Sequence, residues 1–357
     1  MKSNFPALTS LRGIAAWWVV FFHFREQIIT LNSQWLKLIL DHGYLAVDLF
    51  FIMSGFVIAL HYTSRFRSLS KPAIMEFLAL RLARIYPLHF VILVCYLFNP
   101  LSIYLASKSG TVGERYEMGY FLQSLFLIQN WGFNSGLSWN IPAWSISAEW
   151  GAYLVFPVLA WCVTRISKLA VAGSFACLAL ISANIIGYLM GSLGNEIVHF
   201  GLLRCLFEFS LGSLLHRIYA LAGPAYRSPP LTFLAGLALL TVGILADWPD
   251  FQFALASMVL IIIGLLNTES LTSRTLSNPA FLYIGEVSYS TYMVHYFIKD
   301  WTKFLLVGGR LSSTYIFIIY IILTALASVI LYNTVEMPGR RFLRKYITTW
   351  RRQRSEV

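Results

Sequence analysis

Charged side chains are scarce in this chain of 357 residues. Asp, Glu, Lys and Arg together make up 12% of it and hydrophobic residues make up 58%, whereas roughly 25% of a soluble globular protein is charged. Long polar linkers, low-complexity stretches and internal repeats are also missing between residues 8 and 333. Together with a mean hydropathy of +0.67, these features exclude a string of soluble domains and indicate one integral membrane domain.

Metal-binding and redox motifs are absent as well. The four cysteines all fall in apolar segments, which suits small packing residues better than disulfides or metal ligands. No CxxC, HExxH or glycine-rich phosphate loop occurs, so no metal is expected. The chain also has no N-x-S/T sequon, which is compatible with a bacterial source.

Ten apolar segments approach the length of about 20 residues that a helix needs to cross the hydrocarbon core of a bilayer. They are Leu8–Ile29, Tyr44–His61, Ile85–Leu105, Ala143–Val163, Leu169–Met190, Val198–His216, Leu231–Ala246, Phe251–Leu266, Phe281–Ile298 and Thr314–Asn333. We therefore predict an all-α, polytopic membrane protein with about ten transmembrane helices. Residues 1–340 form the predicted membrane-embedded domain, and residues 341–357 form a basic tail. The first segment is too long for the apolar region of a signal peptide, so we interpret it as retained.

Lysine and arginine residues collect on alternate connections between these segments. Because cytoplasmic connections are enriched in these residues, the pattern predicts that both termini face the cytoplasm, with Lys299, Lys303 and Arg310 as a local exception on the other side. The same bias accounts for the net charge of +11, so nucleic acid is not expected as a partner. The basic tail either lies along the anionic inner leaflet or is an ordinary flank of the last helix.

The first segment carries two polar residues that are costly inside a membrane, Arg12 and His23. They are about three helical turns apart, so they share one face of the helix with about 16 Å between them along its axis. Ionisable groups inside a membrane are candidates for function, although Arg12 could snorkel to the interface and His23 could be a packed, hydrogen-bonded residue. Arg204 and Glu208, four residues apart, are more simply explained as an internal ion pair.

Three further polar residues are predicted at the same depth as His23. Asp48 lies in the second segment, Glu149 in the fourth and His295 in the ninth. A carboxylate that accepts the proton of one imidazole nitrogen leaves the other nitrogen free to act as a base. We therefore expect Asp48 to orient His23, with Glu149 and His295 close by.

On the cytoplasmic side, Arg81 and Arg84 lie three residues apart in "RLARIYP" and share one helical surface. Arginine pairs suit phosphates, although such a pair is also an ordinary positive flank of a membrane helix. Trp144, Tyr292 and His295 are the candidate substrate-binding residues. The two aromatic side chains could stack on a sugar ring, but aromatic residues at the membrane interface need no such role, and His295 could instead hold the ninth segment in place.

Several motifs, taken in order, resemble those of the acyltransferase-3 family of membrane O-acyltransferases. They are the Arg-x10-His of the first helix, "DLFFIMSGF", "RLAR", "WSISAE", "SYSTYMVH" and "VEMP". The resemblance covers nearly the whole chain. It implies that His23 is the catalytic histidine, that Arg12 is its motif partner, and that Arg81 and Arg84 contact coenzyme A. Some members carry a second, hydrolase-like domain. This sequence stops soon after its tenth apolar segment, so the chain is expected to be a stand-alone version.

By that resemblance, the chain would take an acyl group, most often acetyl, from cytoplasmic acyl-CoA. It would transfer the group to a hydroxyl of a carbohydrate, including lipid-linked sugars, at the outer face of a bacterial inner membrane. His23 would act as general base, and the catalytic set would also include Asp48 and Glu149. A proton-coupled transporter or flippase is the alternative, because buried ionisable groups also mark transport pathways. No repeat relates two halves of the chain, which favours the enzyme.

Overall fold

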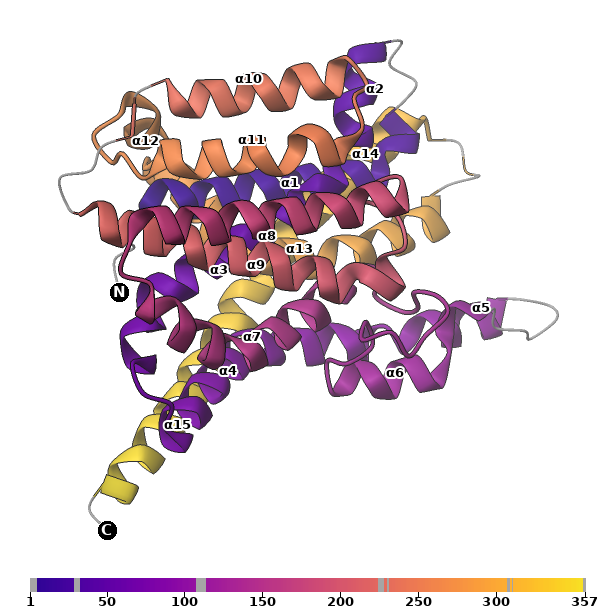
Figure 1. Ribbon diagram of the computed structural model, residues 1–357. Coiled ribbons are helices and arrows are strands. Elements are labelled where there is room, and N and C mark those ends of the chain that lie inside the picture. Colours follow the sequence, from indigo (N-terminus) through magenta and orange to yellow (C-terminus); the bar gives the residue numbers. More distant parts are fainter. Residues whose placement is uncertain are drawn as a thin grey trace.

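The computed structural model describes residues 5–28, 33–106, 114–223, 228–229, 231–306, 309 and 311–355. Throughout these residues the regular structure is helical and no strand occurs. Figure 1 shows a bundle of long helices from which one C-terminal helix, α15 (Met337–Ser355), extends away from the body. The all-α prediction is confirmed.

Each of the ten predicted segments coincides with a helix. In chain order these are α1 (Pro6–Ile28), α3 (Ala46–Tyr62), α4 (Lys71–Cys95) with α5 (Phe98–Ala106), α7 (Trp144–Arg165), α8 (Leu169–Met190), α9 (Ile197–Ala222), α10 (Thr232–Leu245), α11 (Asp250–Leu265), α13 (Pro279–Leu306) and α14 (Ser313–Leu331). Shorter helices are α2 (Gln34–Asp41), α6 (Met118–Leu125) and α12 (Leu271–Leu276).

Within the described residues, seven helical runs are long and apolar enough to cross a membrane. They are Pro6–Glu26, Gln34–Phe66, Lys71–Leu105, Ile141–Arg165, Leu169–Met190, Ile197–Ala222 and Ser313–Thr349. Helices α10 and α11 are apolar but shorter. Helix α13 is long enough, but it is not among these runs because polar residues interrupt its apolar sequence. The structure therefore supports a multi-pass membrane protein with seven clear candidate spans.

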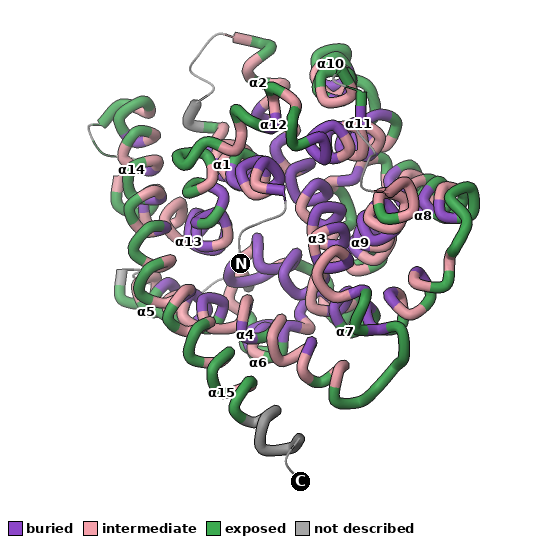
Figure 2. The backbone as a smooth tube through the Cα atoms, turned by 90° about the vertical axis from the view of Figure 1, so that its left-hand side faces the viewer, coloured by how far each residue is buried: buried purple, intermediate pink, exposed green. Residues whose placement is uncertain are grey.

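Glycines set the two closest helix pairs in the bundle. A Cβ on Gly13 of α1 would lie 2.7 Å from the backbone nitrogen of Gly285 in α13, and a Cβ on Gly55 of α3 would overlap the Phe209 carbonyl of α9. Small residues allow such approach of membrane helices. Figure 2 shows that these four helices turn buried residues inward, whereas α14 and α15 expose much of their length. The pairs α1 with α13 and α3 with α9 therefore form the centre of the domain.

Helix α4 begins earlier than the third predicted segment. Ser70 caps it by accepting a hydrogen bond from the Ala73 backbone N–H, and Pro87 lies inside the helix rather than at its start. Arg81 and Arg84 are therefore midway along a helix and not in a flanking connection. Helix α15 packs against α4, because Gly339 brings it so close that a Cβ there would lie 2.8 Å from the Pro87 side chain. The predicted domain boundary at residue 340 falls within α15.

Candidate active site

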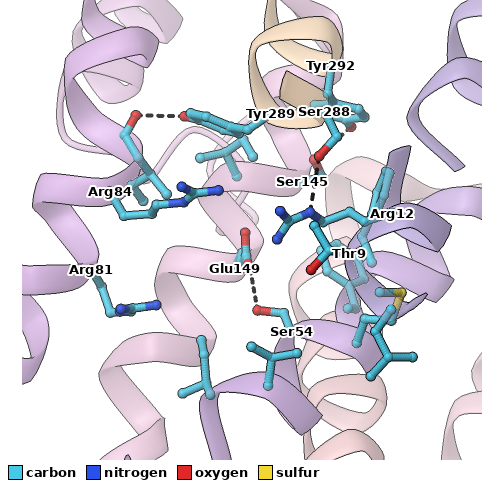
Figure 3. A pocket seen from close by; sticks show the side chains of 18 of the residues that line it. Thr9, Arg12, Ser54, Arg81, Arg84, Ser145, Glu149, Ser288, Tyr289 and Tyr292 are labelled. Carbon is cyan, nitrogen blue, oxygen red and sulfur yellow. Dashed lines mark hydrogen bonds between the residues drawn. The ribbon is translucent and has the colours of Figure 1, made fainter. Parts of the chain in front are cut away.

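A cavity of about 190 Å³ lies among α1, α3, α4, α7 and α13. Many of its lining side chains are apolar, but Arg12, Arg81, Arg84 and Glu149 also line it. Figure 3 shows Arg81 and Arg84 on one side of the cavity, Arg12 on the opposite side and Glu149 between them. Three arginines facing one carboxylate give the cavity an excess of positive charge, so it suits an anionic ligand.

Arg12 is turned into the protein and does not snorkel to the interface. Its Nε donates a hydrogen bond to Ser288 Oγ, and its Nη2 donates one to the Gly285 carbonyl, both at 3.1 Å. In the described part of the chain, no carboxylate lies within ion-pair distance of this guanidinium. Figure 3 shows the guanidinium group directed toward the cavity. Arg12 is therefore anchored by neutral groups and keeps donors for a ligand.

Arg84 and Arg81 are held differently on the opposite side. Arg84 Nη1 lies 3.3 Å from Glu336 Oε1, and the Ser290 hydroxyl donates to the other oxygen of this buried carboxylate at 2.7 Å. Arg81 Nη2 donates to the Tyr62 hydroxyl at 2.8 Å, with its guanidinium over the ring. Glu336 therefore fixes Arg84, whereas Arg81 has only neutral partners among the described residues.

Glu149 belongs to this arginine-lined cavity rather than to a cluster around His23. It accepts hydrogen bonds from the Ser54 hydroxyl and, at 2.6 Å, from the Tyr153 hydroxyl. Its side chain faces the same space as Arg12. The expectation that Glu149 shares a site with the first-helix histidine is not met, because the turn of α7 that carries Glu149 meets α3 at Ser54 and not the C-terminal part of α1 that carries His23.

His23 meets His295 of α13 instead of Asp48. Nδ1 of His23 lies 3.2 Å from Nε2 of His295 and 3.0 Å from the Val19 carbonyl, and Nδ1 of His295 lies 2.6 Å from the Tyr292 carbonyl. Carbonyl oxygens only accept hydrogen bonds, so both Nδ1 atoms carry protons and Nε2 of His295 accepts from His23. This assignment leaves Nε2 of His23 with a free lone pair, which is the state a general base needs.

Asp48 is occupied elsewhere. Its carboxylate lies 3.1 Å from Nε of Arg204, and Glu208 lies 3.7 Å from the same nitrogen. All three side chains are buried. The predicted contact between Asp48 and His23 is therefore wrong: α3 packs on α9 through Gly55, and a buried carboxylate is stabilised next to the buried cation of that helix. The predicted pair of Arg204 and Glu208 is present, but it is part of a group of three.

A layer of side chains separates the cavity from the two histidines. Tyr292 lines the cavity, and its hydroxyl contacts Ser145 Oγ at 2.7 Å and donates to the Pro142 carbonyl at 2.9 Å. Its ring packs against Phe50 on one side and His295 on another, with centroids 5.8 Å apart in both cases. The cavity lining includes neither His23 nor His295, so Tyr292 lies between two separate places, the cavity and the histidine pair.

Trp144 does not face the cavity either. Its ring packs edge-on against Phe51 and lies 5.3 Å from the Arg204 guanidinium. It is 5% exposed, which leaves little surface for stacking on a sugar. Of the two aromatic residues proposed to bind substrate, only Tyr292 is at the cavity.

A protein-family model described as "Acyltransferase domain" matches residues 5–333, which include every residue of both sites described above except Glu336. The chain belongs to the acyltransferase-3 family. Its motif residues thus occupy two neighbouring places, with Arg12, Arg81, Arg84 and Glu149 at the cavity and His23 beyond it.

Curated relatives of this acyltransferase-3 chain are modest in identity but extensive in coverage. O-acetyltransferase OatA of Staphylococcus aureus (strain NCTC 8325 / PS 47) is 27% identical over 94% of this chain and 57% of its own length. Acyltransferase MdmB of Streptomyces mycarofaciens is 27% identical over 95% of this chain and 92% of its own length. The chain thus spans just over half of OatA. No solved structure matches.

Sequence reasoning missed one further arginine close to the acyltransferase-3 cavity, although it is not among the residues that line the cavity. Arg340 follows Glu336 by four residues, so it lies one turn further along the face that meets α4. Arg340 is half-buried, and it is close enough to Arg84 and Arg81 for their positive charges to act on its guanidinium. The spacing of Glu336 and Arg340 was the available signal in the sequence.

Proposed function

We propose that this acyltransferase-3 chain is a membrane O-acyltransferase that takes an acyl group, with acetyl as the expected group, from cytoplasmic acyl-CoA. It transfers this group to a hydroxyl of a carbohydrate at the outer face of a bacterial inner membrane. The names of OatA, an O-acetyltransferase, and MdmB, an acyltransferase, support this chemistry. The observation that carries it is the arrangement on α1, where Arg12 faces a cationic cavity and His23, on the same helix face, presents an unprotonated nitrogen.

The acyl-CoA donor occupies the cavity with its phosphates on the side of Arg81 and Arg84. Arg81, Arg84 and Arg340 contact the phosphates at the end near α15, and the thioester arm extends past Arg12 toward the histidines. About 16 Å of α1 separates Arg12 from His23 along the axis, a distance that suits an extended arm. Tyr292 lies on this path, so its ring turns aside when the arm passes.

The transfer itself conserves protons and electron pairs. Nε2 of His23 takes the proton of the acceptor hydroxyl while the hydroxyl oxygen attacks the thioester carbonyl carbon. The carbon–sulfur bond then breaks, and the thiolate takes the proton from the imidazolium and leaves as the free thiol of coenzyme A. His295 acts as a positioning residue, because its Nε2 accepts a hydrogen bond from the Nδ1–H of His23 and so keeps Nε2 of His23 free of a proton.

The test is acceptor-dependent release of coenzyme A from acetyl-CoA by membranes that contain the chain. Loss of a general base slows a reaction by about 10²- to 10⁴-fold, so the rate of coenzyme A release by the His23→Ala variant is expected to fall by that factor. His199→Ala is the matched control, since His199 is an exposed residue paired with Glu196 at the start of α9. A His23→Ala variant that works at the parental rate would overturn the assignment, and thioester loss that requires an acceptor would exclude simple transport.

A further inference from the structure

The region beyond the histidine pair carries positive charge that the insertion rule does not explain. The sequence predicts Lys299 and Lys303 on the side of the membrane that is otherwise poor in lysine and arginine; Arg310, the third member of this cluster, lies outside the described residues. Arg25 and Arg115 join the same region in the structure, the first at the end of α1 and the second beside α13. A cationic surface in this place calls for a reason other than topology.

Most of these cations are neutralised within the protein. Arg25 Nε lies 2.7 Å from Asp41, Lys303 Nζ lies 3.2 Å from Glu26, and Arg115 pairs with Asp300. Lys299 is different: in the described part of the chain, no carboxylate oxygen lies within 4.0 Å of its ammonium group. The region therefore contains three ion pairs and, among its described residues, one cation without a counter-ion.

The unpaired ammonium is held next to the candidate base. Lys299 follows His295 by four residues on α13 and so lies one turn further along the same face. Its Nζ lies 3.5 Å from the ring centroid of Tyr296, a cation–π contact that limits where the ammonium can go. The same ring also contacts His23, edge-on with centroids 5.1 Å apart. One aromatic ring thus links the free cation to the imidazole.

We infer that Lys299 binds an anionic group of the acceptor, so that the carbohydrate acylated at His23 is acidic. This inference rests on the proposed function and names its substrate class. The anion is either the carboxylate of a sugar acid or the phosphate that joins a sugar to a lipid carrier. Both place a negative charge on Lys299 while a neighbouring hydroxyl reaches Nε2 of His23.

The experiment can be carried out before the acceptor is identified. Detergent-permeabilised membranes of cells that express the full chain receive acetyl-CoA labelled in the acetyl group, and the labelled glycans are separated by anion exchange. The label is expected in the retained, anionic fraction. Mild acid then distinguishes the two sources, because it releases phosphate-linked sugars from their carrier and leaves sugar carboxylates retained.

Lys299→Gln tests the residue itself, with Lys303→Gln as the matched control one turn further along α13. A charge-assisted contact removed from a binding site weakens binding by about tenfold or more, so labelling of the anionic fraction at limiting acceptor is expected to fall about tenfold in Lys299→Gln. Lys303→Gln is expected to match the parent. Kinetics on the isolated acceptor should show a raised KM with kcat retained.

Three outcomes separate the two proposals. Label that elutes with neutral glycans overturns the acidic acceptor and leaves the acyltransferase intact. Equal labelling by the Lys299→Gln and Lys303→Gln variants overturns the role of Lys299. Absence of any transfer from acetyl-CoA by the parent chain, in membranes where it is folded, overturns the proposed function instead.

Discussion

Two arginines inside the helix bundle, Arg12 of α1 and Arg204 of α9, have opposite surroundings. Arg204 is 3% exposed and lies between two buried carboxylates, Asp48 and Glu208. Arg12 is bound only by a hydroxyl and a carbonyl among the described residues, and it faces a cavity. A buried charge that the protein neutralises by itself belongs to the fold, whereas a charge left without a counter-ion beside a cavity belongs to a ligand site.

The comparison is tested most strongly at Arg204. Removing one partner of a buried ion pair costs about 3–5 kcal/mol because the remaining charge is uncompensated. Arg204→Met leaves two buried carboxylates without a counter-ion, so it is expected to lower the yield of folded protein and its thermal stability in detergent. Size-exclusion chromatography of heated samples measures this stability. The triple variant Asp48→Asn, Arg204→Met, Glu208→Gln is expected to recover much of that stability. Wild-type stability of Arg204→Met would show that the group is not structural.

Arg12→Met is the counterpart at the cavity. It removes a guanidinium without leaving a carboxylate unpaired, so the fold is expected to persist. The ligand loses a charge-assisted contact worth about 2 kcal/mol, which corresponds to about a thirtyfold rise in KM for acetyl-CoA. Ser288→Ala, which removes only one anchor of the side chain, serves as the control and should have a smaller effect. A loss of stability as large as that of Arg204→Met would erase the distinction between the two arginines.

The sequence predicts the helices of this fold well, because hydropathy and helix ends are local. The segment Leu169–Met190 coincides with α8, which contains no charged residue and ends at Gly191, a residue in the left-handed conformation with φ of +76°. The shared face of Arg12 and His23 is also confirmed, since both side chains contact α13. Three helical turns are enough to fix that relation.

Partners between helices could not be predicted in the same way. Depth in the membrane is one coordinate, and it placed Asp48 level with His23, but direction around the helix axis decides which helix a side chain meets. Asp48 meets Arg204 of α9, which is far along the chain, because Gly55 packs on the Phe209 backbone. His295 took the expected place of Asp48 because Gly285 packs on α1. These contacts follow from tertiary packing that no local pattern contains.

Arg340 provides the smallest and most selective test of the comparison. It lies near Arg81 and Arg84 on the face of α15 that packs on α4, whereas Arg341 is exposed on the same helix. If Arg340 contacts a donor phosphate at the rim of the cavity, Arg340→Gln should raise KM for acetyl-CoA by about fivefold, or about 1 kcal/mol, and should reduce the preference for acetyl-CoA over its 3′-dephospho analogue.

Arg341→Gln is the matched control and is expected to leave both quantities unchanged. Anionic lipid headgroups offer the same phosphate chemistry to α15, so the measurement is made in vesicles of neutral lipid and repeated with anionic lipid. A donor role persists in neutral lipid, because the bound phosphate is part of the substrate. An effect of Arg340→Gln that occurs only with anionic lipid, and equally for both donors, would assign Arg340 to the membrane surface rather than to the donor and leave Arg12, Arg81 and Arg84 as the donor site.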